Sequence, residues 1–218
     1  MEAYSFTNSN SIGPGHEENQ DSYLVDKENA MFAVADGVGG YLGGKIASKL
    51  AIDILEERAG SISDEKSMSK VLEHINSAII RKADELNYHM MGTTIVAAKI
   101  INGSIVIGNV GDSAAILFSA KGGEAVAVYT DDSLRSKDPE NMWQITQCMG
   151  MMSKPHTRTE KLKRGDTLLL ASDGITDNLN INEIKKLIRN KNPSKEIVSA
   201  AIASGRKKDD ATAVCIKL

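Results

Sequence analysis

Four strand-like segments in close succession constrain the fold of this chain more than any other feature. They are separated only by the short turn signals "NG", "GD" and "KGG", which are typical of hairpins. In order, the segments are "TTIVAAKII" (93–101), "GSIVIGNVGD" (103–112), "SAAILFSA" (113–120) and "EAVAVYT" (124–130). This succession predicts consecutive antiparallel strands.

The remaining strands and the helices lie on both sides of this run. Apolar runs predict further strands at 22–25, 30–36, 166–174 and 211–218. Apolar residues at helical spacing predict helices at about 43–59, 64–88, 181–190 and 194–204. Strands in runs and helices in pairs favour α+β layers over alternating βαβ units. The 218 residues are enough for one substantial core, so we expect a single domain over residues 1–218.

The composition excludes several classes of protein. Hydrophobic residues make up 41% and charged residues 25% of the chain, which is ordinary for a soluble globular protein. No apolar run approaches the roughly 20 residues that cross a bilayer. Residues 1–21 lack the basic start and apolar core of a signal peptide, so we expect a cytoplasmic protein that does not engage a membrane. The net charge of −3 gives no electrostatic reason to bind nucleic acid.

Basic residues and cysteines give weaker signals. Basic residues gather at 154–165, 185–195 and 205–208, which we interpret as solvated faces of helices and loops. A surface that attracts acidic or phosphorylated partners is the alternative. The two cysteines, Cys148 and Cys215, lie far apart and form no CxxC pair, which argues against structural zinc and a disulfide scaffold.

Aspartates recur where the predicted strands begin or end. Asp36 and Asp173 each end a strand and are followed directly by glycine. Any one such residue could be an ordinary turn residue or helix cap. Together, carboxylates repel one another unless a cation compensates, and carboxylate, carbonyl and water ligands select hard ions, chiefly Mg²⁺ or Mn²⁺. The strand-boundary acids are Asp21, Asp36, Asp112, Asp173, Asp209 and Asp210.

The stretch "FAVADGVGGYLGGKIASK" (32–49) places one of these acids beside a glycine-rich turn. Such turns between a strand and a helix usually hold phosphate through backbone N–H groups, and the carboxylate of Asp36 would weaken that grip. A carboxylate that first binds a metal ion reverses the sign of the site. Gly37 would then let its backbone carbonyl approach the ion closely.

Six segments follow one another over about residues 19–216: "ENQDSY", "VADGVGG", "MGTTIVAA", "IGNVGDSAAILF", "GDTLLLASDGITD" and "DDATAVCI". In this order they resemble the metal-dependent serine/threonine protein phosphatases, the type 2C family. The resemblance implies an α+β fold with four αββα layers, in which two antiparallel β-sheets are flanked by helix pairs. It also implies a centre of two Mg²⁺ or Mn²⁺ ions at one end of the sandwich.

The resemblance assigns roles to the acids at the strand ends. By position, Asp36 resembles the carboxylate that bridges both ions, and Gly37 resembles a carbonyl ligand. Asp173 and Asp209 resemble ligands of the first ion, and Asp21 resembles the acid that holds metal-bound waters. These four aspartates are therefore the expected catalytic residues.

The resemblance also implies a reaction and its partners. Asp112, within "VGDS", resembles the acid that binds a weaker third ion together with Asp173 in the bacterial branch. The implied reaction hydrolyses phosphoserine and phosphothreonine in proteins by in-line attack of a water shared by two ions, without a phosphoenzyme. The expected partners, in signalling, are a phosphorylated protein substrate and a cognate serine/threonine kinase. Nothing in the sequence demands more than a monomer.

The chain departs from the family pattern on the substrate side. His16 stands where the family has an arginine that grips phosphate, five residues before the aspartate of "NQD". Because an imidazole is charged only when protonated and lacks a bidentate fork, we hypothesise that His16 supports phosphate binding only in its protonated form. A solvent-facing loop histidine is the alternative. Ala114 and Gln147 also replace family arginines, and Val38 replaces the histidine that serves as general acid in eukaryotic members.

The segment at about 131–148 is shorter than the family's flap beside the active site. It contains Trp143, the only tryptophan, which we interpret as a packing residue, with substrate contact as the alternative. A trimmed flap would leave the metal site more open and less selective, or would let the protein recognise one partner with surfaces that the family lacks.

Other kinds of function fit the sequence less well. A cysteine phosphatase needs Cys-x₅-Arg, but Lys154 stands at that spacing from Cys148. A dinucleotide fingerprint read from Gly37 fails at Leu42. The main alternative is a catalytically weak phosphatase-like module that binds metal and a phosphoprotein partner. The lost arginines favour this module, whereas the intact acids oppose it, because clustered carboxylates cost stability unless metal is bound.

Overall fold

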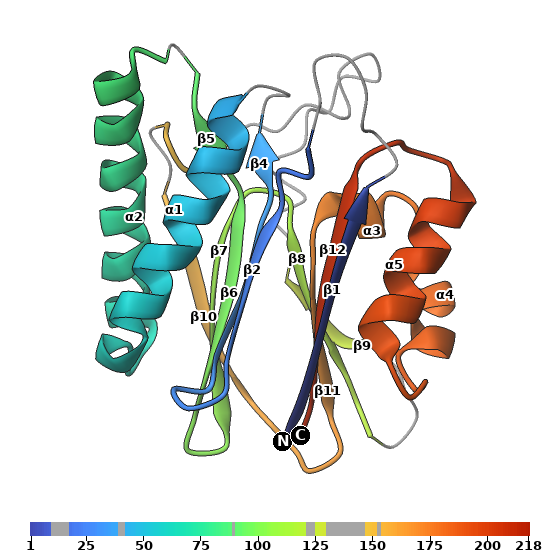
Figure 1. The fold of residues 1–218 in the computed structure, drawn as a ribbon. Coiled ribbons are helices and arrows are strands. Elements are labelled where there is room, and N and C mark those ends of the chain that lie inside the picture. Colours follow the sequence, from blue (N-terminus) through green and yellow to red (C-terminus); the bar gives the residue numbers. More distant parts are fainter. Residues whose placement is uncertain (10–17, 39–41, 89, 121–124, 130–146, 152–153) are drawn as a thin grey trace.

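The computed structural model describes residues 1–9, 18–38, 42–88, 90–120, 125–129, 147–151 and 154–218. Two β-sheets stack face to face, and helices cover the outer face of each sheet (Figure 1). The chain therefore adopts the α+β sandwich of four αββα layers that the sequence predicts. Both termini lie at one end of this sandwich, and the short strands labelled β4 and β5 in Figure 1 lie at the other.

Each main sheet contains five strands, and every neighbouring pair is antiparallel. The strands of one sheet, in spatial order, are β1 (Glu2–Ser9), β12 (Asp210–Lys217), β11 (Thr167–Ala171), β8 (Ala114–Phe118) and β9 (Ala125–Tyr129). Those of the other sheet are β10 (His156–Lys161), β7 (Ser104–Val110), β6 (Ile95–Ile101), β3 (Met31–Ala35) and β2 (Ser22–Asp26). A separate two-stranded ribbon consists of β4 (Gly37–Val38) and β5 (Gly92–Thr93).

Helix pairs cover the two sheets on opposite sides of the sandwich (Figure 1). On the sheet that contains β3 lie α1 (Leu42–Arg58), the short 3-10 helix η1 (Ala59–Ser61) and α2 (Glu65–Leu86). On the sheet that contains β12 lie α3 (Asp173–Thr176), α4 (Ile181–Leu187) and α5 (Pro193–Ser204). The four predicted helices are confirmed, and α3 is an additional single turn.

Three hydrophobic clusters fill the spaces between the layers. Strand β3 shows how the sequence builds them, because all five of its residues are buried. Phe32 and Val34 belong to the cluster between the two sheets. Met31, Ala33 and Ala35 alternate with them and face the helices, in line with the period of two along a strand.

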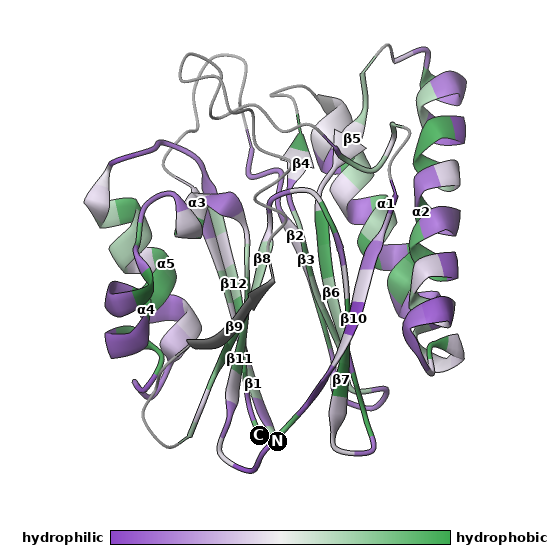
Figure 2. Cartoon of the chain, turned by 180° about the vertical axis from the view of Figure 1, so that it is seen from behind, coloured by the Kyte–Doolittle hydropathy of each residue, from purple (hydrophilic) through white to green (hydrophobic). Residues whose placement is uncertain are grey.

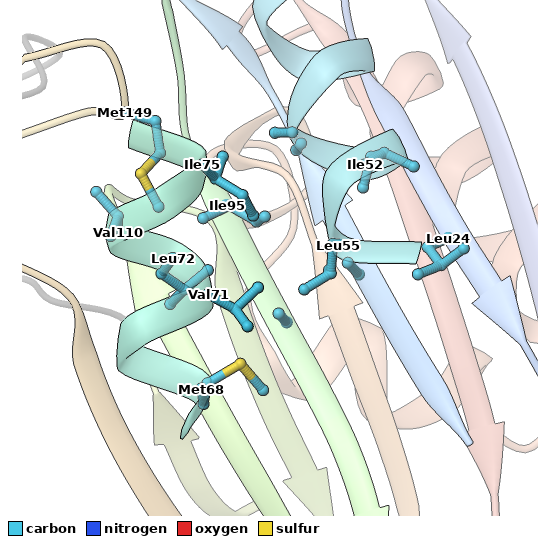
Figure 3. Packing of buried hydrophobic residues seen from close by; sticks show 14 of the residues in the cluster. Leu24, Ile52, Leu55, Met68, Val71, Leu72, Ile75, Ile95, Val110 and Met149 are labelled. Atoms are coloured by element: carbon cyan, nitrogen blue, oxygen red, sulfur yellow. The ribbon is translucent and has the colours of Figure 1, made fainter. Parts of the chain in front are cut away.

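The helix-covered side of this sheet is packed by an apolar stripe on α2. Figure 3 shows Met68, Leu72 and Ile75 directed at the sheet, close to Ile95 and Val110. The first three residues recur at spacings of three and four, which places them on one face of the helix. The stripe holds α2 against the sheet.

The run of four predicted strands is divided between the sheets. β6 pairs with β7, and β8 pairs with β9, but β7 and β8 belong to different sheets. The chain crosses between the layers at the "GD" link, where Gly111 has a φ of 98° that favours glycine. The predicted hairpins β6–β7 and β8–β9 are therefore confirmed, whereas the "GD" link does not close a hairpin, and Asp112 lies at this crossover.

Two strands, β1 and β10, go beyond the prediction. Both are edge strands, and both lack the long apolar run that reveals a central strand. β10 carries the sequence "HTRTEK" and is largely hydrophilic (Figure 2), as is common for exposed sheet edges. The interpretation of 154–165 as part of a solvated helix or loop is therefore wrong for His156–Lys161. Within the described ranges, we find no helix that is long and apolar enough to span a membrane.

Candidate metal centre

Five of the strand-boundary acids lie at the same end of the sandwich, opposite the chain termini (Figure 1). They come from both sheets, because strands of each sheet begin or end at this end of the sandwich. Asp36 follows β3, Asp21 precedes β2, Asp173 begins α3 directly after β11, Asp209 precedes β12, and Asp112 lies between β7 and β8. The structure thus brings together all the acids that the sequence nominates for the site.

The strand register explains this meeting within each sheet. Ser22 at the start of β2 pairs with Ala35 at the end of β3, which places Asp21 beside Asp36. In the other sheet, Ala171 at the end of β11 pairs with Ala213 near the start of β12. Antiparallel pairing therefore puts the end of one strand next to the beginning of its neighbour.

Hydrogen bonds across the two sheets hold their ends together. The Ser172 hydroxyl donates to Oδ2 of Asp21 at 3.0 Å, which joins β11 to the loop before β2. The backbone N–H of Gln20 donates to Oδ2 of Asp210 at 2.7 Å, which joins the same loop to β12. Asp210 therefore connects the two sheets.

Two threonines fix the main chain of Asp36. The Thr93 hydroxyl and the Thr94 N–H both donate to the Asp36 carbonyl oxygen at 2.8 Å. The Asp36 N–H in turn donates to the Thr94 hydroxyl at 3.1 Å. The Thr94 hydroxyl also shares a hydrogen bond of 2.6 Å with the Ser113 hydroxyl, beside Asp112. The "TT" of "MGTTIVAA" therefore sets the position of Asp36 and ties it to the β7–β8 crossover.

Gly37 lies where two backbones meet. A Cβ atom at this position would come within 2.5 Å of the carbonyl carbon and oxygen of Gly44 and within 2.9 Å of the Gln20 carbonyl oxygen. These contacts leave room only for a hydrogen atom, and they bring the first turn of α1 against β4. Tight packing of α1 accounts for Gly37 and Gly44, and the expected approach of the Gly37 carbonyl to a metal ion stays a prediction.

The acids form one electrostatic unit around Asp36. Burial raises the pKa of Asp36 well above its ordinary value, and the negative charges of the four other acids raise it further. Those acids, in order of decreasing effect, are Asp21, Asp173, Asp209 and Asp112. A cation placed among them would reverse this penalty.

Asp21 is the most deeply buried of the predicted site acids, with only 3% of its surface exposed. Burial raises the pKa of Asp21 to about 7, and the charges of Asp210 and Asp173 add to this effect. Hydrogen bonds from Thr212 and Ser172 act in the opposite direction. An ionised Asp21 therefore needs compensation from a positive charge.

The chemistry of the donor set fits a hard divalent ion. Within the described ranges, Oδ1 of Asp21 and Oδ1 of Asp173 are buried oxygens without a hydrogen-bond partner. Buried carboxylate oxygens in this condition are costly unless they bind a cation. Carboxylates and a backbone carbonyl are the ligands that Mg²⁺ and Mn²⁺ prefer. These residues could therefore hold such an ion.

Lys207 and Asp177 are further members of the site, and neither is recognisable as one from the strand-boundary pattern of the sequence. The Lys207 ammonium lies 2.5 Å from Oδ2 of Asp173, 2.8 Å from Oδ2 of Asp209 and 3.2 Å from Oδ2 of Asp177. Burial acts to lower the pKa of Lys207, but the charges of Asp173 and Asp209 outweigh it and raise the pKa. Asp177 follows Asp173 by one helical turn, and this spacing is a signal that could have revealed it.

The cation in this part of the site is therefore the ammonium of Lys207. Among the described residues, no group of three or more His, Cys, Asp or Glu side chains is arranged to hold a metal ion as it stands. Lys207 lies between the carboxylates of Asp173 and Asp209, the residues expected to bind the first ion.

Several residues named from the sequence lie outside the described residues or away from the acids. His16 and most of the proposed flap, including Trp143, are outside the described ranges. Ala114 begins β8 and is buried, Gln147 is half-buried, and Val38 ends β4. The assignments on the substrate side of the site therefore stay predictions.

Both cysteines should be unreactive in the folded protein. Burial raises the pKa of Cys148 to about 11, with the charge of Asp112 adding to it, and burial raises the pKa of Cys215 to about 12. At pH 8 the thiols are therefore almost entirely protonated, and only the thiolate is nucleophilic. We expect slow reaction with Ellman's reagent in buffer and fast reaction of two thiols per chain in guanidinium chloride. A thiol that reacts within seconds in the native protein would reopen the cysteine-nucleophile alternative.

Known proteins resemble this chain over most of its length. Residues 14–214 match the family Protein phosphatase 2C. The serine/threonine phosphatase stp of Listeria monocytogenes serovar 1/2a is 27% identical over 201 residues, covering 81% of this chain and 79% of that protein. The protein phosphatase PhpP of Streptococcus pneumoniae serotype 2 is 28% identical over 201 residues, covering 81% of each.

A solved structure shares the fold throughout. The catalytic domain of the serine/threonine protein phosphatase PstP, in complex with two manganese ions, aligns with a TM-score of 0.81 and 21% identity. The alignment covers 100% of this chain and 98% of that chain. The expected fold is confirmed by this likeness, and the expected enzyme class, a protein-serine/threonine phosphatase, is confirmed by the family match and the named relatives. With the family match extending over residues 14–214, the chain belongs to the protein phosphatase 2C family.

Proposed function

We propose that this chain hydrolyses phosphoserine and phosphothreonine in proteins with two Mg²⁺ or Mn²⁺ ions, without a phosphoenzyme. The observation that carries the proposal is the meeting of Asp36 with four other acids from both sheets, with buried oxygens of Asp21 and Asp173 that lack hydrogen-bond partners among the described residues. In its ionised form such a cluster is stable only with compensating positive charge. In a protein phosphatase 2C chain, divalent ions are the natural source of that charge.

We assign the ligands as the family resemblance implies them. Asp36 would bridge the two ions, the Gly37 carbonyl would be a further ligand, Asp173 and Asp209 would hold the first ion, and Asp112 with Asp173 would hold a weaker third. Bound ions would supply a nucleophilic water at neutral pH and would neutralise charge on the phosphoryl oxygens. No side chain of the protein is then needed as the nucleophile.

The protein's own contribution is to hold these oxygens in place. Thr93 and Thr94 fix the main chain of Asp36 on both sides. Ser172 donates to Oδ2 of Asp21, and the buried Oδ1, which has no hydrogen-bond partner among the described residues, is left to accept hydrogen bonds from waters. Such preorganisation spares the cost of arranging the charges during the reaction.

A catalytically weak module that binds metal and a phosphoprotein partner is the second candidate. The observation that favours it is the ammonium of Lys207 between Asp173 and Asp209, where it opposes entry of a second cation. The predicted loss of arginines at His16, Ala114 and Gln147 points in the same direction.

Hydrolysis of p-nitrophenyl phosphate and of a phosphothreonine peptide, with Mn²⁺ or with EDTA, separates the two candidates. The proposed enzyme turns over both substrates only with Mn²⁺. Hydrolysis in ¹⁸O-water then transfers one solvent oxygen to phosphate. Acid quenching during turnover of a phosphate-labelled substrate traps no phosphorylated form of the enzyme. Calorimetric binding of Mn²⁺ without turnover would instead favour the weak module.

The His16 hypothesis gives a prediction about substrate affinity. We expect His16→Arg to lower the KM for p-nitrophenyl phosphate and to leave kcat less changed, because arginine provides a permanent charge and a bidentate fork. In the wild type, KM should fall as the pH decreases through the ordinary histidine range near 6.5, since only the protonated ring is charged. Steady-state kinetics measure both effects. The pH is varied from about 5.5 to about 8, so that it extends at least roughly one unit to either side of the ordinary histidine pKa. An unchanged KM in the arginine variant would refute the hypothesis.

The biological setting follows from the same proposal. We propose that the chain acts as one domain over residues 1–218, as a monomer in the cytoplasm, on a phosphorylated protein and opposite a cognate serine/threonine kinase. Size-exclusion chromatography with light scattering tests the monomeric state directly.

A further inference from the structure

Lys207 lies within the described acid cluster, and the proposed function gives it no role in catalysis. Its ammonium contacts three carboxylates, those of Asp173, Asp209 and Asp177, at 2.5 to 3.2 Å. Its side chain is 24% exposed, and that of Asp177 is 3% exposed, so solvent screens these ion pairs only partly. A cation already lies where the first metal ion is expected.

The backbone of Lys207 is held so that its side chain must enter the site. Asn178, which follows α3, accepts a hydrogen bond from the Lys207 N–H at 2.9 Å and donates one to the Lys207 carbonyl oxygen at 3.0 Å. Asn178 is itself buried and donates to the Gly174 carbonyl oxygen at 2.9 Å. The segment before β12 is thereby fixed to α3, the helix that begins at Asp173 and is followed directly by Asp177.

A divalent ion and this ammonium cannot share the same carboxylate oxygens. Both are positive, and each needs oxygens of Asp173 and Asp209 at close range. A metal ion bound at Oδ1 of Asp173 lies beside the ammonium on Oδ2 of the same carboxylate and is repelled by it, and an ion that takes Oδ2 of Asp173 or of Asp209 must break an ion pair of Lys207. The free-energy cost of this repulsion or of the broken ion pair is subtracted from the affinity for the ion.

We propose that Lys207 is an internal cation that competes with a divalent ion for Asp173 and Asp209 and so sets the metal affinity of the first-ion position. The inference rests on the proposed function, because it assumes that these two acids bind metal. Without metal, Lys207 compensates the repulsion within the acid cluster. With metal, it is displaced towards solvent, so occupancy of the first position depends on the free concentration of Mn²⁺ or Mg²⁺.

Calorimetric titration of the full chain with Mn²⁺ tests the competition. We expect Lys207→Met to lower the Kd of the affected position by at least about tenfold, or about 1.4 kcal/mol. Lys208→Met is the matched control, because it removes the same charge one residue further along the chain, from an exposed side chain. If both variants tighten binding equally, general electrostatics explains the effect and the inference is wrong.

Thermal unfolding provides a second readout, in which Lys207→Met should lower the melting temperature without metal but increase the stabilisation that Mn²⁺ gives. In EDTA, Lys207→Met should melt at a lower temperature than the wild type, because three carboxylates lose their cation. In excess Mn²⁺, its melting temperature should rise by more than that of the wild type. Lys207→Gln, which is neutral but can still donate to Asp173 and Asp209, provides the same comparison if the methionine variant does not fold.

Acylation of the wild type reports the displacement itself. Lysine acetylation by an N-hydroxysuccinimide ester, read by mass spectrometry, should increase at Lys207 when Mn²⁺ is added and stay constant at Lys208. Constant labelling of Lys207 would overturn the inference.

The outcomes also separate this inference from the proposed function. If Mn²⁺-dependent hydrolysis occurs but wild type and both Lys207 variants share one Kd, only the competition is wrong. If none of the three proteins binds Mn²⁺, the proposed function is wrong as well.

Discussion

Replacing Asp36 with asparagine should abolish Mn²⁺-dependent phosphatase activity, with kcat/KM falling by at least about a thousandfold. Asp36 lies at the electrostatic centre of the acid cluster, because all four other site acids act on it. Asparagine keeps the size of the side chain but removes the charge that would bridge two ions. Losing metal-assisted charge neutralisation costs several kcal/mol of transition-state stabilisation, which corresponds to this fold-change.

The same substitution should not destabilise the metal-free protein. The pKa of Asp36 is raised in the folded state, so the folded protein binds its proton more tightly than the unfolded chain does. As the pH rises above the ordinary value near 3.8, ionisation of Asp36 therefore lowers the free energy of unfolding of the metal-free protein. Asparagine removes this cost, and in EDTA at pH 7 the variant should melt at or above the wild-type temperature.

The matched control for this experiment is Asp53→Asn. Asp53 lies on α1, forms an ion pair with Lys49 and has 44% of its side chain exposed, away from the acid cluster. Its activity and Mn²⁺ dependence should equal those of the wild type, since exposed ion pairs contribute little. If Asp36→Asn retained more than about a tenth of the wild-type kcat/KM, a loss below about 1.4 kcal/mol, Asp36 could not be the bridging ligand.

The acids could be predicted from sequence because each occupies a recognisable place. Asp36 and Asp173 follow apolar runs that are buried on both faces, and such runs are the strongest strand signals in the chain. Antiparallel pairing then brings the ends of neighbouring strands together. The convergence of two separate sheets does not follow from periodicity, and it was expected only through the resemblance to a known family.

Lys207 could not be identified because its local sequence is uninformative. "GRKK" has the composition of a solvated turn, and its two other basic residues, Arg206 and Lys208, are indeed exposed. Only the packing of α3 against the start of β12, which Asn178 maintains, turns the Lys207 side chain towards Asp173. The division of β7 and β8 between the sheets escaped prediction for a similar reason, since a three-residue link can close a hairpin or cross between layers.

Gly174→Ala should be the most destabilising small substitution at the site. A Cβ atom at Gly174 would overlap the carbonyl oxygen of Asp210 and lie 2.9 Å from its carbonyl carbon. Both atoms are backbone atoms at the start of β12, where Asp210 also accepts the hydrogen bond from Gln20, so neither can move without shifting a strand. Overpacking against fixed backbone costs about 3 kcal/mol or more, which for a chain of this length lowers the melting temperature by about 6–12 °C.

The overlap also lies between two expected ligands, because Gly174 follows Asp173 and Asp210 follows Asp209. Relief of the clash must separate α3 from β12, and this movement should weaken Mn²⁺ binding as well as stability. Gly60→Ala is the control: the nearest atom to its Cβ is Oδ1 of Asn29 at 3.9 Å, so its melting temperature should stay within about 2 °C of the wild type. Differential scanning calorimetry and Mn²⁺ titration measure both effects. A Gly174→Ala protein that matches the Gly60→Ala control in both would show that α3 and β12 are not in close contact, and the placement of Asp173 beside Asp209 would have to be abandoned.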